Sequence, residues 1–342
     1  MKAVVYYDSN DFKLEEVPTP EIGQGEVLVK VKACGLCSTD VWKAMYHGVE
    51  KGAVIGHEVS GEVAKIGQGV DGLKLGDRVA VYHRAECGAC HYCRHDQGTL
   101  CNQYRQQSIF PGTFTEYIRI IPRLVQKSII KMLHDLTFEE ATMIEPTACC
   151  VNAVSRCEIT LGDSVLVIGD GPLGLLNAQV SKNAGASTVI LSGHNDYRLD
   201  IAERIGVDYV LNSKNVDLKE KVMALTEKRG VDAVIVAVAS TDAVRQSMGL
   251  VRNGGKICLF GDFRDVPQPK FELELKTILS NDIHLLSNWG CSTKNYRTAY
   301  DLVTSRQVKV REMITHRFPL AKFSEALRVF FSKECMKIVL TT

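Results

Sequence analysis

Four cysteines lie close together in the sequence, at Cys87, Cys90, Cys93 and Cys101. Their spacing, C-x2-C-x2-C-x7-C, lets four thiolates surround one metal ion at the Zn–S distance of ~2.3 Å. Four thiolates fill a tetrahedral shell, so we expect a structural zinc that stabilises a loop at residues 84–104, the zinc lobe, which has little apolar core. The alternatives are free surface thiols and an iron–sulfur cluster, whose usual cysteine run ends with a different spacing.

A second group of possible metal ligands is spread more widely. Cys37 and His57 offer a thiolate and an imidazole, and Glu58 and Glu145 offer carboxylates. A catalytic zinc needs about three protein ligands and one open position for water or substrate, so the third ligand is Glu145 or Glu58. Along a plain strand Glu58 would point away from His57, which favours Glu145, whereas a turn at this point would reverse the preference.

A glycine-rich turn follows an apolar stretch at residues 164–168 and leads into a helical stretch at 173–184. Its pattern, G-x-G-x-x-G between a strand and a helix, predicts a dinucleotide site. The three glycines would permit the tight turn, the approach of the pyrophosphate and close packing of the helix, while amides at the helix start bind the phosphates. The residues expected there are Gly169, Gly171, Pro172, Leu173 and Gly174.

The sequence around these motifs shows two patterns of secondary structure. Residues 1 to about 150 contain short apolar or alternating runs broken by Gly and Pro, which is typical of β structure. From about residue 160, apolar strands such as Thr188–Ser192 and Val234–Val238 alternate with helical stretches such as Arg198–Ile205. This alternation predicts a parallel sheet with helices on both faces.

Composition narrows the function classes. The 342 residues suit two domains, and 41 Lys+Arg against 40 Asp+Glu give a net charge of +1, which argues against a nucleic-acid-binding protein and against a membrane surface. The apolar runs are too short to cross a bilayer. Twelve cysteines without a signal-peptide pattern favour reduced, metal-binding thiols. We therefore expect a cytoplasmic protein.

Several motifs resemble one known family. The run GHEVSG at residues 56–61, the run GDRV at 76–79 and the four cysteines resemble the zinc-containing medium-chain alcohol dehydrogenases over nearly the whole chain. Within that family, the run MIEP at 143–146 is similar to sorbitol and other polyol dehydrogenases, which place a glutamate where simple alcohol dehydrogenases have a third cysteine. The runs NDYRL at 195–199 and THRF at 315–318 resemble threonine dehydrogenases.

The resemblance implies a role for each matching residue. Cys37 and His57 would ligate the catalytic zinc, with Glu145 or Glu58 completing or exchanging in the shell. Asp40 would hydrogen-bond the ligating imidazole and fix its orientation.

The same resemblance suggests a route for the substrate proton. The hydroxyl of Thr39 would pass it outward. Many relatives have a relay histidine five residues after the ligand cysteine, but this chain has Trp42, so the proton would leave through water, Glu58 or another group such as His47.

The resemblance also implies an α/β fold in two domains. Residues 1–150 and 291–342 would form a β-rich, GroES-like catalytic domain that carries the zinc lobe. Residues 151–290 would form a Rossmann dinucleotide-binding domain with a doubly wound parallel sheet. Family members suggest a homodimer or homotetramer, with a small molecule as the other partner.

Cofactor choice depends on the end of the second Rossmann strand. An NAD enzyme has an acidic residue about 20 positions past the glycine motif to bond the ribose 2′-hydroxyl, and in the family pattern that position is Gly193. We therefore predict NADP over NAD, unless Asp196 reaches the ribose instead. The residues expected around the 2′-phosphate are Ser192, Gly193, His194, Asn195 and Arg198.

The sequence thus predicts a zinc-dependent oxidoreductase with two zinc ions per chain that transfers hydride between a secondary alcohol and a nicotinamide cofactor. A polyol or sugar alcohol, or the matching ketose, is the expected substrate. L-Threonine or another amino alcohol, or a simple secondary alcohol, is the alternative. A non-catalytic, cofactor-binding relative would have lost the first zinc ligands, yet Cys37, His57 and Glu145 are all present.

Overall fold

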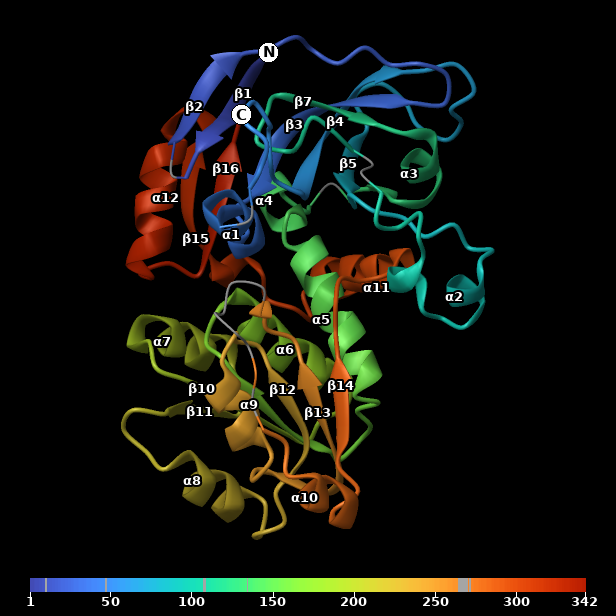
Figure 1. The fold of residues 1–342 in the computed structure, drawn as a ribbon. Coiled ribbons are helices and arrows are strands. Elements are labelled where there is room, and N and C mark those ends of the chain that lie inside the picture. Colours follow the sequence, from blue (N-terminus) through green and yellow to red (C-terminus); the bar gives the residue numbers. More distant parts are fainter. Residues whose placement is uncertain (10, 47, 107–108, 134, 264–269, 271) are drawn as a thin grey trace. The chain divides into compact units, whose positions relative to one another are not determined.

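The computed structural model describes residues 1–342 except 10, 47, 107–108, 134, 264–269 and 271, so His47 lies outside the described residues. The chain divides into two compact units (Figure 1). The first unit contains residues 1–148, 291–306 and 314–342, and the second contains residues 149–290 and 307–313.

This division differs from the predicted boundaries at residues 149–150, which group with the second unit, and in one longer segment. Residues 307–313, which we had assigned to the catalytic domain, group with the second unit. The backbone N–H of Lys309 donates to the side-chain oxygen of Gln179 at 2.7 Å, and its ammonium donates to the carbonyl of Ile205 at 2.9 Å. Both partners belong to helices of the second unit, which explains why this short segment packs there.

In its described residues the first unit is built on an eight-stranded sheet and a separate two-stranded sheet. The central strand of the larger sheet is β3, which pairs antiparallel with β4 along one edge and with β7 and then β16 along the other. The strands are β1 (Lys2–Asp8), β2 (Asp11–Glu16), β3 (Val27–Gly35), β4 (Glu58–Ile66), β5 (Arg78–Val81), β6 (Ile109–Phe110), β7 (Tyr117–Ile120), β8 (Ile129–Lys131), β15 (Ile314–Pro319) and β16 (Lys337–Thr341).

Helices of the first unit are short or lie near its ends in the sequence. They are α1 (Ser38–Tyr46), α2 (His91–Arg94), α3 (Pro122–Lys127), α4 (Phe138–Ala141), the start of α5 (Ile144–Arg156), α11 (Thr293–Thr304) and α12 (Phe323–Ser332), with 3-10 turns at Gly98–Leu100 and Leu320–Lys322. α12 buries Phe323 and Leu327 in the same apolar core as Val29 and Val31 of β3. Burial of these side chains, at ~25 cal/mol per Å² of apolar surface, holds the sheet that positions the site.

The register of β3 and β4 brings two distant segments together. Gly35, at the end of β3, pairs with Glu58, at the start of β4. Cys37 follows the first strand by two residues, and His57 immediately precedes the second. The sheet therefore places these two predicted ligands beside each other, although 19 residues separate them in the sequence (57 minus 37, less one).

The second unit is a six-stranded parallel sheet in the order β11-β10-β9-β12-β13-β14. Numbered from the first strand of the unit, this is the order 3-2-1-4-5-6 of dinucleotide-binding folds. The strands are β9 (Ser164–Ile168), β10 (Thr188–Gly193), β11 (Tyr209–Asn212), β12 (Val231–Val236), β13 (Val251–Leu259) and β14 (His284–Ser287). The helices are most of α5, α6 (Pro172–Asn183), α7 (Asp196–Ile205), α8 (Leu218–Leu225), α9 (Thr241–Ser247) and α10 (Leu275–Ser280), with a 3-10 turn at Arg311–Met313.

Helices cover both faces of this sheet (Figure 1), and every residue of β9 is buried. Burial on two faces explains why β9 is a nearly continuous apolar run in the sequence. The predicted α/β fold, with a β-rich unit and a Rossmann unit, is therefore confirmed. Among the described residues, each helix is too short or too polar to cross a membrane.

Candidate metal and cofactor sites

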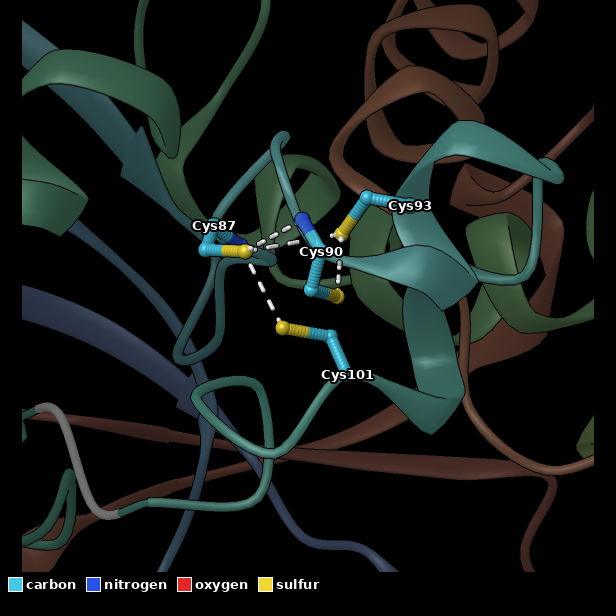
Figure 2. Close-up of side chains that lie close together, drawn as sticks. All are labelled: Cys87, Cys90, Cys93 and Cys101. Carbon is cyan, nitrogen blue, oxygen red and sulfur yellow. Dashed lines mark hydrogen bonds between the residues drawn. The ribbon is translucent and has the colours of Figure 1, made fainter.

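The four cysteines of the zinc lobe converge on one point (Figure 2). The sulfur of Cys93 lies 3.5 Å from that of Cys90 and 3.9 Å from that of Cys87. Four sulfurs at ~2.3 Å from one zinc ion would be separated by about 3.8 Å, the edge of the tetrahedron. The cysteines therefore fit a tetrahedral zinc. None of the twelve cysteines, all of which the structure describes, forms a disulfide.

Backbone amides of the lobe stabilise negative charge on these sulfurs. The N–H groups of Ala89 and Cys90 donate to the sulfur of Cys87 at 3.4 and 3.3 Å, and that of Gly88 donates to Cys93 at 3.3 Å. The first two lower the pKa of Cys87 to about 6, whereas burial raises the pKa of Cys93 to about 12. A cation would favour deprotonation of all four thiols.

A second cluster of donor atoms lies at the ends of β3 and β4. Ligand atoms of Cys37, His57 and Glu58 all lie within 4.8 Å of one another. Of the two cases that the sequence left open for Glu58, the structure does not have the plain strand at His57. His57 is not part of a strand but follows Gly56, whose φ is 101°, so the alternation of a strand begins only at Glu58.

The imidazole of His57 is oriented by a buried carboxylate. Its Nδ1 lies 3.0 and 2.8 Å from the two carboxylate oxygens of Asp40, which is 5% exposed. Burial would lower the pKa of His57, but Asp40 and then Cys37 raise it well above its ordinary value. With Nδ1 engaged, Nε2 is the nitrogen left to bind a metal, as the family resemblance implied.

Glu145 approaches the same cluster from the start of α5. One oxygen, Oε2, lies 3.9 Å from Nε2 of His57, and the other, Oε1, lies 4.0 Å from Nδ1 of His83. Burial raises the pKa of this carboxylate. The structure therefore brings both candidate carboxylates to His57, and Glu58 belongs to the tighter group with Cys37. A thiolate, an imidazole and two carboxylates are a donor set that suits zinc.

Two residues of this site were not found from the sequence. Lys337, at the start of β16, forms an ion pair with Glu58, and the two side chains are 4% and 1% exposed. Gly35 makes room for this pair, because a β carbon there would overlap the Glu58 carboxylate. His83 follows β5 and faces Glu145. In the sequence, the only indication of either residue was a charged or polar side chain beside an apolar strand.

Of the residues considered for the proton route, Thr39 and Trp42 lie on α1 and Glu58 begins β4, while His47 is outside the described residues. Thr39 is half-buried, between Cys37 and Asp40 in the sequence. The ring of Trp42 stacks on Tyr46 with 5.4 Å between centroids. An indole ring has no titrating group, so Trp42 adds none to the proton route.

The glycine turn of the second unit has the geometry expected for a dinucleotide site. Gly169 has φ 126°, a conformation that favours glycine, and Gly171 is the N-cap of α6. A β carbon on Gly174 would overlap the carbonyl oxygen of Gly169, so α6 can pack this closely only because Gly174 has no side chain. Pro172 and Leu173 are the first two residues of α6, where amides would meet phosphate.

The turn after β10 is held by Asp170. Its Oδ2 accepts hydrogen bonds from the backbone N–H groups of His194 and Asn195 at 2.7 and 2.8 Å, and its Oδ1 lies 3.8 Å from Arg198. A β carbon on Gly193 would overlap this carboxylate. Ser192 and Gly193 end β10 and are buried, whereas His194 and Asn195 form the turn and Arg198 lies in the first turn of α7.

Comparison with known proteins identifies the family. Residues 23–129 match the family described as alcohol dehydrogenase GroES-like domain, and residues 172–305 match the zinc-binding dehydrogenases. The chain is 32% identical to a sorbitol dehydrogenase from Halalkalibacterium halodurans, over 100% of this chain and 99% of that protein. The chain belongs to the zinc-containing medium-chain alcohol dehydrogenases.

Other medium-chain dehydrogenases are similar along the same length. An L-threonine 3-dehydrogenase from Pyrococcus horikoshii is 32% identical over 96% of this chain and 94% of its own. A zinc-binding dehydrogenase from Sinorhizobium meliloti, solved with NADP, has a TM-score of 0.87 and 27% identity, and covers 100% of this chain. The predicted family and the predicted oxidoreductase class are thus confirmed, with zinc and a nicotinamide cofactor as the family's requirements.

Proposed function

We propose that this medium-chain dehydrogenase oxidises a polyol or sugar alcohol to the matching ketose, and reduces the ketose in the other direction. The observation that carries the proposal is the position of Glu145, whose Oε2 lies 3.9 Å from Nε2 of His57. A buried carboxylate beside the metal ligands offers a hydrogen-bond acceptor to a substrate with several hydroxyl groups. The similarity to a sorbitol dehydrogenase supports the same substrate class.

The residues around His57 would each have one task. A zinc ion held by Cys37, His57 and a carboxylate supplies a Lewis acid that makes an alcohol O–H acidic. Asp40 engages Nδ1 of the imidazole, which would leave Nε2 to bind the ion. Thr39 would accept the proton that the alcohol loses and pass it to water. Gly169–Gly174 would hold the pyrophosphate of a nicotinamide cofactor, which would supply the hydride acceptor.

We also propose two zinc ions per chain and a preference for NADP. The four sulfurs of the zinc lobe and the cluster at Cys37 each have a donor set for one zinc. NADP is favoured because position 193 has no carboxylate and no space for one, while Arg198 lies at the start of α7. We also propose that the protein is a homodimer or homotetramer and that it is cytoplasmic. Cysteines that form no disulfide suit a reducing compartment.

The test combines a substrate panel with metal analysis. Polyols, sugar alcohols, simple secondary alcohols and L-threonine are assayed with NAD and NADP, and zinc per chain is measured by mass spectrometry. We expect the highest kcat/KM with a polyol and NADP, and two zinc ions. A higher kcat/KM with L-threonine than with any polyol would refute the polyol proposal, and a clear NAD preference would refute the cofactor proposal. A protein that turns over no substrate and contains one zinc ion per chain would be a non-catalytic relative. Light scattering of the purified protein tests the oligomer.

A further inference from the structure

The hydrogen-bonding state of His83 is fixed by its neighbour. The Nε of Arg84 lies 2.9 Å from Nε2 of His83. A guanidinium group has only donors, so Nε2 must be the acceptor, and a neutral imidazole that accepts at one nitrogen carries its hydrogen on the other. His83 therefore presents an N–H group at Nδ1.

Arg84 is itself well anchored. Its Nη1 donates to the backbone carbonyl of Tyr104 at 3.0 Å, and its guanidinium lies 5.3 Å from the centre of the Tyr104 ring. The hydroxyl of Ser128 donates to the backbone carbonyl of Arg84 at 2.8 Å. Because these contacts hold the guanidinium in place, the N–H of His83 has a defined direction.

That N–H faces a carboxylate at a distance that suits a bridging group. Nδ1 of His83 and Oε1 of Glu145 are 4.0 Å apart, which is too far for a direct hydrogen bond. A hydroxyl oxygen about 2.8 Å from each atom would make an angle of about 90° between them. A hydroxyl group accepts from one partner and donates to the other, which is the combination that an N–H and a carboxylate require.

The second oxygen of Glu145 points to the metal ligands. Oε2 lies 3.9 Å from Nε2 of His57, and the rings of His57 and His83 have their centroids 4.8 Å apart. The position between His83 and Glu145 is therefore next to the side chains that would hold a metal ion. The side chains of His83 and Glu145 are 17% and 9% exposed, so the pair is largely withdrawn from solvent.

We propose that His83 and Glu145 bind a second hydroxyl group of the substrate, adjacent to the one that is oxidised, and that this pair selects vicinal diols over mono-alcohols. The inference rests on the proposed function, since it names the feature of a polyol that the site recognises. Glu145 accepts the hydrogen of the second hydroxyl, and His83 donates to its oxygen. Arg84 is a positioning residue that keeps the His83 hydrogen on Nδ1.

The test compares 2,3-butanediol with 2-butanol, which share a carbon skeleton and differ in one hydroxyl. The measured quantity is the ratio of kcat/KM for the diol to kcat/KM for the mono-alcohol. His83→Phe removes the donor, and we expect the ratio to fall about 10- to 100-fold, the usual effect of one lost hydrogen bond in a buried site. His83→Asn keeps an N–H donor at the place of Nδ1 and restores most of the ratio, whereas His83→Gln places its amide farther out and does not.

A binding measurement separates recognition from catalysis. With reduced cofactor no hydride can be accepted, so calorimetry reports the affinity of the diol without turnover. His83→Phe is expected to weaken diol binding about 10-fold or more, with zinc content equal to that of the wild type. His284→Phe, at an exposed histidine of β14, is the matched control and leaves the ratio unchanged.

The outcomes distinguish this inference from the proposed function. An unchanged ratio in His83→Phe, or an equal loss on both alcohols together with lost zinc, overturns the role of His83 while polyol oxidation by the wild type stands. Failure of His83→Asn to recover the ratio, with zinc content intact, also overturns the donor role. A wild type that oxidises no secondary alcohol refutes the proposed function and, with it, the recognition of diols.

Discussion

The ion pair between Lys337 and Glu58 makes a quantitative test of which carboxylate completes the metal shell. Both side chains are almost fully buried, so Lys337→Met leaves the Glu58 carboxylate in a low-dielectric environment without its cation. Breaking a buried pair from one side costs about 3–5 kcal/mol. In the zinc-free protein we therefore expect the free energy of unfolding to fall by that amount.

In the zinc-loaded protein the loss should be smaller. If Glu58 is a ligand, the dication takes the place of the missing ammonium and neutralises the carboxylate. By the thermodynamic cycle, the difference between the two losses equals the gain in zinc affinity. A difference of about 2 kcal/mol corresponds to roughly 30-fold tighter zinc binding in Lys337→Met. The zinc affinity rises rather than falls because removal of a positive charge near the site favours binding of a cation.

The assay is denaturant unfolding of wild type and variant, each with zinc and after chelation, together with zinc affinity from competition with a chelator. The zinc of the lobe contributes equally in both backgrounds and cancels. Lys131→Met is the matched control, because Lys131 pairs with Asp77 at the surface, with 48% and 22% of the side chains exposed, and should cost no more than about 1 kcal/mol. Equal destabilisation of Lys337→Met with and without zinc would refute the assignment of Glu58 and leave Glu145 as the carboxylate ligand.

Three further predictions follow from other parts of the molecule. Cys93→Ser should lower zinc by about one ion per chain and make residues 84–104 sensitive to protease, and an unchanged zinc content would contradict the tetrahedral cluster. Arg198→Ala should reduce kcat/KM about 10-fold with NADP and less than about 2-fold with NAD, and an equal loss with both cofactors would count against a 2′-phosphate site. Burial would raise the pKa of Asp232, but hydrogen bonds from Ser164 and Arg252 hold it below its ordinary value. The contribution of the ionised Asp232 to folding stability is thus fully present above the unfolded pKa of about 3.9. It is lost as pH falls through the lower folded pKa. Asp232→Asn should cost about 1 kcal/mol at pH 7 after allowance for solvent screening, and the cost should vanish in acid unfolding curves.

Motifs whose residues lie within a short window could be predicted from the sequence. The four cysteines span 15 residues, from Cys87 to Cys101, and the glycine turn joins one strand directly to one helix. Local backbone geometry is sufficient to bring such groups together, so both motifs have the geometry expected of them. The alternation of apolar strands and helices likewise predicted the parallel sheet, because burial on two faces makes central strands such as β9 and β12 strongly apolar.

The catalytic cluster depends on information that no short window contains. The sequence left the direction of Glu58 open, and the structure shows that strand alternation does not apply at His57, which follows Gly56 with its positive φ. Lys337, the partner of Glu58, begins β16, and His83, which faces Glu145, follows β5. The sequence does not specify which strands lie beside these two in the sheet.

The sequence by itself determined the family, the zinc lobe and the glycine turn, because each is encoded by residue types at fixed local spacing. Only the tertiary structure decided which carboxylates meet His57, that Lys337 neutralises Glu58, and that His83 faces Glu145. These pairs are set by the pairing of Gly35 with Glu58 and by the packing of distant strands, and such long-range register is a property of the whole sheet.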